Sequence, residues 1–361
     1  MTTLAKVLGV VVVFCLMCES EVCAQQVQAG NSKSWSFGGN VQLQYLWDTS
    51  IDQSSNRLNN GFFIRRGRLQ VRGKLTDYVE TNFQIEVRDN APRLKDAEGI
   101  IKLPEGLHLR FGQFKVPVWR EELRSSTRLL LVERSSASVI LLLLNLSARQ
   151  IGAEFGHARF AVNLSNGAGE GGREVAGISP DRLFVNNGKL ITARINLLNG
   201  KSLQCGISGA VNWVGAKIDT SDNTGKISAV APDFGIYLST GANSNLDIEG
   251  GFAYGNNDSP ILTSTVGPHF ALFDVTGRWM TRLANPLIAA GGLDGYEFAA
   301  GLTYLNGNTD VADDERIDLR FGPAIYFGKH TRLQINGELL MPQAEGADSI
   351  FQLRSQANFV F

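Results

Sequence analysis

Alternation of apolar and polar residues is the feature of this sequence that most restricts its fold. Segments of about ten residues repeat this alternation along much of the chain. Leu246, Ile248 and Phe252, for example, share one phase. Asp247 and Glu249 take the other phase. A period of two residues is typical of β-strands that have one apolar and one polar face. The sequence therefore predicts an all-β protein.

The whole chain contains sixteen candidate strands. They are residues 34–47, 62–75, 77–89, 95–103, 106–115, 149–156, 158–166, 189–198, 203–213, 227–240, 246–254, 266–280, 295–305, 316–327, 331–341 and 351–361.

The lengths of the connections indicate how these strands are arranged. Most connections after even-numbered strands are short, namely residues 76, 104–105, 157, 199–202, 241–245 and 328–330. Most of those after odd-numbered strands are longer, namely residues 48–61, 116–148, 167–188, 214–226, 255–265, 306–315 and 342–350. Residues 90–94 and 281–294 break the pattern. Short turns at one end and long loops at the other are typical of a transmembrane antiparallel β-barrel in the outer membrane. An even strand count then places both termini on the periplasmic side.

A soluble β-sandwich or lipocalin-like barrel is the alternative, with the apolar phase turned toward a core. The length of the chain and the aromatic residues near strand ends, such as Trp47, Trp213 and Tyr254, favour the membrane instead. The final strand also ends on Phe361, which resembles the assembly signal of outer-membrane barrels. We therefore expect the outer membrane and its lipid as the surroundings of the barrel.

The N-terminus has the pattern of a secretory signal peptide. Lys6 precedes the apolar run Val7–Met17, and Val22-Cys23-Ala24 places small residues at the −3 and −1 positions. The run is too short for a membrane-spanning helix, which needs about 20 residues. We expect a signal peptide at 1–24 and a barrel domain at 25–361. Cys205 is then the one cysteine of the mature chain, so no internal disulfide is expected.

Positive charge is concentrated in the first half of the chain. Without Lys6, Glu19 and Glu21, the 34 basic and 35 acidic residues become 33 of each, which does not suit a nucleic-acid-binding protein. Residues 62–134, however, carry 15 Lys and Arg against 10 Asp and Glu.

The segment FFIRRGRLQVRGK, residues 62–74, is the most basic of these strands. Its alternation turns one set of cations toward the lumen, namely Arg66, Arg68, Arg72 and Lys74. The opposite register would place them in lipid, at about 2–4 kcal/mol each near the bilayer midplane. Arg65 is out of phase, which leaves either a position at the external interface or a local bulge.

The connection 116–148 is a candidate for a loop folded into the pore. A barrel of sixteen strands is wide enough to leave an aqueous channel. A connection of 33 residues is long and therefore of functional interest. An additional strand pair within it, which would give eighteen strands, is the alternative.

Further cations and hydroxyls follow in and after the fifth candidate strand. Rings of Arg and Lys select anions in pores, and the arginine fork suits phosphate. The sequence thus predicts an anion-binding constriction, to which the second group of residues belongs: Arg110, Lys115, Arg124, Ser125 and Ser126. The alternative is that acidic residues neutralise the cations across the lumen, with Glu80, Glu86, Asp89, Glu121 and Glu122 as candidates.

Several motifs resemble one known family. They are GQFKVPVWREELRSS at 112–126, VERS at 132–135, the arginine pair in FFIRRGRLQVRG, LKDA at 94–97, RQIG at 149–152, NGAG at 166–169 and LRSQANFVF at 353–361. The chain is similar through them to the phosphate-selective porin O and P family, most densely over residues 60–170.

The resemblance implies a sixteen-stranded outer-membrane porin, assembled as a homotrimer, for small anions such as phosphate or polyphosphate. It also implies the constriction residues, which by motif position are Arg65, Arg66, Lys115, Asp89 and the pair Ser125-Ser126. The later strands carry fewer arginines than this family has. A general or organic-anion diffusion porin therefore stays open as an alternative.

We expect passive diffusion without catalysis, cofactor or metal. An outer-membrane enzyme is a rival class, since His157 and His269 have serines near them in the sequence. A soluble or surface-attached binding protein is the other.

Overall fold

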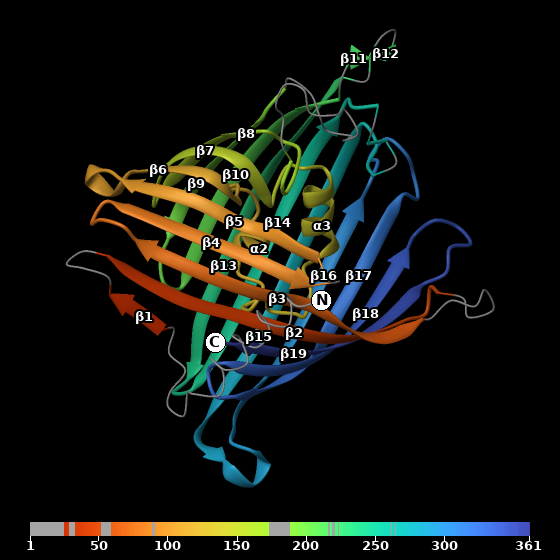
Figure 1. Ribbon diagram of the computed structural model, residues 1–361. Helices are drawn as coiled ribbons and strands as arrows, with labels where there is room; N and C mark the ends of the chain where they lie inside the picture. Colours follow the sequence, from red (N-terminus) through yellow and green to blue (C-terminus); the bar gives the residue numbers. More distant parts are fainter. Residues whose placement is uncertain are drawn as a thin grey trace, which may run out of the picture.

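The computed structural model of the chain is a closed antiparallel β-barrel (Figure 1). The structure describes residues 25–28, 33–51, 59–88, 91–172, 188–215, 217–218, 221–222, 224–260, 262–263 and 265–361. The expected signal peptide, residues 1–24, lies outside these ranges.

Sixteen strands form the barrel wall, and each pairs with the next along the chain. In the first half they are β2 (Ser34–Asp48), β3 (Asn60–Lys74), β4 (Val79–Arg88), β5 (Ala91–Lys102), β6 (His108–Lys115), β7 (Arg149–His157), β8 (Phe160–Ser165) and β9 (Leu190–Asn199). In the second half they are β10 (Leu203–Val214), β13 (Gly225–Gly241), β14 (Ser244–Asn257), β15 (His269–Leu287), β16 (Leu293–Asn306), β17 (Glu315–Phe327), β18 (Thr331–Pro342) and β19 (Ile350–Val360).

The ring closes where β19 pairs with β2, from Gln352↔Asp48 to Val360↔Asn40. All sixteen expected strands are confirmed, and the alternative of eighteen is wrong. Outside the ring, β1 (Gln25–Gln28) pairs with the start of β2. The strands β11 (Lys217–Ile218) and β12 (Ser221–Asp222) pair with each other in a long loop.

The two faces of the wall have the polarity that the alternation predicts. Leu69, Phe83 and Phe111 lie on the outer face, each with 46–47% of its surface exposed. Inward-facing neighbours such as Arg66 and Glu86 are buried inside the barrel. An apolar outer face suits lipid and contradicts a soluble barrel, whose apolar phase would turn inward.

One break in the expected alternation of turn lengths has a structural explanation. β15 and β16 continue past the barrel as a two-stranded ribbon, seen in light blue at the bottom of Figure 1. The ribbon ends in the 3₁₀ turn η3 (Ile288–Ala290), followed by Gly291 and Gly292 at φ 70° and 82°, which favour glycine. Residues 281–294 are therefore mostly strand, not loop. A second 3₁₀ turn, η2 (Pro104–Gly106), joins β5 and β6.

The connection 116–148 folds into the barrel and contains two short helices, α2 (Arg120–Leu123) and α3 (Ser136–Leu143). None of the helices in the described part of the chain is long and apolar enough to cross a membrane. Trp119 and Leu141 of this loop pack against inward-facing side chains of the wall, including Phe270 and Leu272. This contact explains why the later strands carry fewer arginines toward the lumen, because part of their inner face is an apolar core.

The outward register of the apolar phase predicts the effect of a charge on that face. Phe321→Arg, in the middle of β17, should destabilise the barrel by about 2–4 kcal/mol because it places a cation near the bilayer midplane. Phe62→Arg, near the outer end of β3, is the matched control and should cost about 0–1 kcal/mol. Urea unfolding in lipid vesicles, followed by tryptophan fluorescence, measures both. Equal effects would contradict the assigned register.

Candidate functional site

The loop 116–148 leaves the wall at a closed base. The backbone N–H of Val116 donates to the Ala148 carbonyl at 2.8 Å, so the two ends of the loop stay paired. Trp119 then turns the chain inward with a positive φ of 66°. Gly251 of β14 allows the close approach of Trp119, since a Cβ at this glycine would lie 2.9 Å from the indole ring.

Two arginines attach the α2 region of the loop to the wall. Arg120 Nε lies 3.1 Å from Asp233 Oδ1 of β13. Arg124 forms an ion pair with Glu249 of β14. Both contacts lie inside the barrel, where the carboxylates are almost fully buried.

Two side chains of β18 bind the backbone of the next part of the loop. Arg332 donates to the carbonyls of Leu129 and Leu130, at 2.8 and 3.0 Å. The Asn336 side-chain oxygen accepts from the Val132 N–H at 2.7 Å. These bonds satisfy buried backbone groups that would otherwise be costly, so they determine the path of the loop across the lumen.

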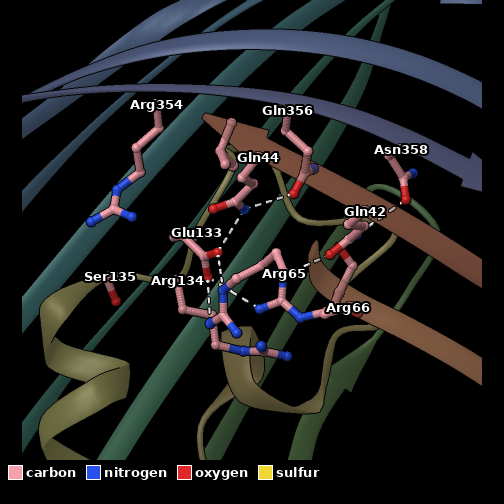
Figure 2. Close-up of polar contacts among 12 residues, drawn as sticks. Gln42, Gln44, Arg65, Arg66, Glu133, Arg134, Ser135, Arg354, Gln356 and Asn358 are labelled. Atoms are coloured by element: carbon pink, nitrogen blue, oxygen red, sulfur yellow. Dashed lines mark hydrogen bonds and ion pairs between the residues drawn. The ribbon is translucent and has the colours of Figure 1, made fainter. Parts of the chain in front are cut away.

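Glu133 connects the loop to the basic strand on the other side (Figure 2). Its carboxylate lies 2.6 Å from Arg65 Nε and 3.1 Å from Arg66 Nη2. Gln44 Nε2 of β2 also donates to it, at 2.8 Å. Burial alone would raise the pKa of Glu133, but the charges of Arg66 and Arg65 and these hydrogen bonds outweigh it and lower the pKa to about 2.

A β-bulge places both arginines of the pair inside the lumen. The register between β2 and β3 runs from Gln42↔Arg66 directly to Leu43↔Ile64, so Arg65 is the extra residue. Of the two positions that the alternation left open for Arg65, the bulge is confirmed.

Arg68 lies one lumen position further along β3 and joins the loop through Ser126. Arg68 Nη1 donates to Ser126 Oγ at 2.9 Å, while its Nε lies 2.6 Å from Glu86 of β4. Lys95 Nζ is 4.0 Å from the same Glu86 carboxylate. A predicted hydroxyl and a predicted cation are thus in direct contact.

Lys115 points into the base of the loop. Its ammonium group donates to the carbonyls of Glu122 and Arg124, the latter at 3.0 Å. The Glu122 carboxylate lies 3.5 Å from Lys115 Nζ and 2.8 Å from Arg134 Nε. The Ser125 hydroxyl bonds to Thr127 Oγ1 at 3.0 Å.

The remaining predicted residues lie apart from this group. Arg110 forms an ion pair with Glu98 and lies over the Phe114 ring, 4.2 Å from its centroid. Arg72 is exposed, and Lys74 pairs with Asp77 of the adjacent short turn at 2.8 Å. Asp89 lies outside the described residues.

The sequence left open the alternative that acidic residues neutralise the cations of the lumen, and the structure agrees with it in part. Glu86 and Glu122 do pair with predicted site cations. Glu80 pairs instead with Lys102, and Glu121 accepts from the backbone and hydroxyl of Ser135. Sequence reasoning missed the central position of Glu133, which it included only as one residue of the VERS motif. No local pattern marks it, because its partners come from β2 and β3.

The comparisons with known proteins agree with the barrel fold. Residues 37–177 match the family model described as phosphate-selective porin O and P. This part of the chain is similar to that family. No curated protein matches the chain.

Solved outer-membrane porins share the fold of this porin. An anion-selective porin from Comamonas acidovorans is 11% identical, with a TM-score of 0.58 over 91% of this chain and 100% of that one. The outer-membrane channel DcaP of Acinetobacter baumannii is 11% identical, with a TM-score of 0.59 over 93% and 99%. OprB of Pseudomonas putida is 10% identical, with a TM-score of 0.59 over 91% and 94%. Together the family and the fold show an outer-membrane channel rather than an enzyme.

The lowered pKa of Glu133 predicts how the stability of the porin depends on pH. The folded value of about 2 lies below the model-peptide value of 4.5, so the ionised form stabilises the fold above pH 4.5. This stabilisation, up to about 3 kcal/mol, should be lost as the pH falls from about 4.5 toward 2. Glu133→Gln should remove that part of the pH dependence, whereas Glu345→Gln, on an exposed loop, should retain it. Urea unfolding in detergent at pH 3 and pH 7 gives the free energy of unfolding of the wild type and both variants. If Glu133→Gln loses as much stability between pH 7 and pH 3 as the wild type, the assignment is refuted.

Proposed function

We propose that the porin is a passive diffusion channel for anions, with phosphate or polyphosphate as the solute. Its selectivity would come from the level of the lumen at which the loop 116–148 meets β3 and β6. The family model that matches residues 37–177 is described as phosphate-selective, which supports this solute.

The observation that carries the proposal is the sharing of carboxylates. Glu133, Glu86 and Glu122 each contact at least two cations of this region. The seven cations that share them are Arg65, Arg66, Arg68, Arg88, Lys95, Lys115 and Arg134. Three carboxylates for seven cations leave positive charge in the lumen, although Glu170 also neutralises Lys95. Because the wall around this level has a low dielectric constant, an excess of one sign attracts counter-ions into it.

The chemistry of the donors favours oxyanions. Guanidinium groups donate parallel hydrogen bonds to two oxygens of a phosphate, and hydroxyls such as those of Ser125 and Ser126 add neutral donors. We assign the constriction to Arg65, Arg66, Arg68, Lys115, Arg124, Ser125 and Ser126. Arg110, Arg72 and Lys74 would continue the cation path toward the short turns. The resemblance still assigns Asp89 to this level.

The proposal also covers assembly and catalysis. We propose that the porin forms a homotrimer in outer-membrane lipid and acts without catalysis and without a cofactor. In the described part of the chain, no three His, Cys, Asp or Glu side chains are placed to hold a metal ion.

Substitutions of opposite sign test the anion selectivity. Arg66→Ala removes a cation from the shared carboxylate and should lower the chloride-to-potassium permeability ratio about fivefold, since a unit charge a few Å from an ion contributes about 1 kcal/mol in water. Glu133→Gln should raise the same ratio. Reversal potentials in planar bilayers under a KCl gradient measure both variants.

Arg354→Ala is the control, because Arg354 pairs with Glu338 of β18 at 3.0 Å and has no hydrogen bond or ion pair with the loop among the described residues. It should change the ratio less than Arg66→Ala. Cation preference of the wild type, or conductance in chloride that added phosphate leaves unchanged, would refute the proposal.

A further inference from the structure

A cavity of about 510 Å³ lies between the loop and the short-turn end of the lumen. On one side its lining comes from the loop, through Pro117, Leu123 and Arg128 among others. On the other side it comes from the wall near the short turns, through residues such as Asn199 and Gln204. We call this cavity the inner chamber.

Cations dominate the lining of the inner chamber. Six of them line it, namely Arg110, Lys115, Arg120, Arg124, Arg128 and Arg194. Only two carboxylates, Glu154 and Glu249, share the lining. The other carboxylates that pair with these cations, Glu98, Glu122 and Asp233, do not line it. The surface that a solute meets is therefore more positive than the pairing alone indicates.

Arg128 is the most available of these cations. Its carbonyl accepts from Arg124 at 2.9 Å, but its guanidinium group has no hydrogen-bond or ion-pair partner among the described residues. The side chain is exposed to the chamber. It can therefore give its full set of N–H donors to an anion without breaking an existing contact.

The chamber is far too large for inorganic phosphate alone. Cavities of about 300–1,000 Å³ are the size that holds small organic molecules. Phosphate, with five heavy atoms, would fill only a fraction of it.

Neutral polar side chains line the part of the chamber next to β9 and β10. Asn199 has no side-chain partner among the described residues. Gln204 accepts from Arg120 through its oxygen at 2.8 Å, which leaves its NH₂ group to donate. Asn196 and Tyr237 add further polar atoms. Such groups suit the hydroxyls of a solute, while Leu123 and Leu198 provide apolar contact surface.

We propose that the inner chamber binds phosphorylated hydroxyl-bearing organic molecules, of which sugar phosphates are the simplest. The phosphate group would contact Arg128 and Arg124 of the loop, and the hydroxylated body would contact Asn199 and Gln204. This inference rests on the proposed anion channel and names its solute class: an organic phosphate binds in the chamber more tightly than phosphate itself.

Current block in planar bilayers tests the proposal with the intact porin. Glucose 6-phosphate, inorganic phosphate and glucose are added in turn to the short-turn side while chloride current is recorded. Glucose 6-phosphate should reach half-block at a concentration about tenfold below that of phosphate, the effect of about 1.4 kcal/mol of extra contacts. Glucose should give no block. Equal block by the two phosphates, or block by glucose as well, would overturn the proposal.

Variants locate the site. Arg128→Ala should raise the half-blocking concentration of glucose 6-phosphate about tenfold, as expected for loss of a charge-assisted hydrogen bond. Gln204→Ala should raise it for glucose 6-phosphate but not for phosphate. Arg159→Ala, an exposed arginine of a short turn that does not line the chamber, is the matched control and should change neither value. A wild-type response in Arg128→Ala would overturn the assignment to the chamber.

The permeability ratio separates the two proposals. A cation-selective channel refutes the anion channel, and the sugar-phosphate site with it. An anion-selective channel that does not prefer glucose 6-phosphate over phosphate refutes the sugar-phosphate site alone.

Discussion

Hydrogen bonding of the backbone in lipid is the constraint on which the rest of this structure depends. No water is present in the hydrocarbon region to satisfy an open strand edge, so a sheet can cross it only as a closed ring. Here β19 returns to pair with β2 along nine residue pairs and leaves no edge. Closure also separates the two faces of every strand, because one must meet lipid and the other the lumen. The orientation of Arg66 and Arg68 toward the lumen follows from this constraint before any contact with the loop is considered.

The loop 116–148 lies inside the ring and is attached to it by two kinds of contact. Apolar side chains such as Leu141 attach it to one wall, next to Phe270. Ion pairs attach it to the opposite strand, where Glu133 contacts Arg65 and Arg66. A buried carboxylate next to two cations is anchored firmly because removal of either partner leaves a charge without compensation. The same contact neutralises part of the positive charge of β3.

Particular residues show how far sequence reasoning reaches. The alternation located every strand, most of them to within a few residues, and it assigned the lumen side of β3. It could not place Arg65, because a bulge depends on the register of β2 against β3 and leaves little trace in either strand. It read residues 281–294 as a loop, whereas pairing of β15 with β16 extends both strands past the barrel. Lys115 was correctly placed next to the loop, but its bonds to the carbonyls of Glu122 and Arg124 depend on how the loop folds back.

The sequence by itself determined the barrel and the side of β3 on which its cations lie, and it left the strand number at sixteen or eighteen. Those properties follow from a period of two residues and from the cost of charge in lipid, both of which act locally along a strand. Only the tertiary structure decided which cations share a carboxylate and that Glu133 joins the loop to β3. It also decided that the guanidinium group of Arg128 lies in the inner chamber without a hydrogen-bond or ion-pair partner among the described residues. These contacts join residues far apart in the chain, since Glu133 and Arg65 are 68 positions apart. The physical reason is that charge pairing depends on distance in space, and only the path of the loop across the lumen sets that distance.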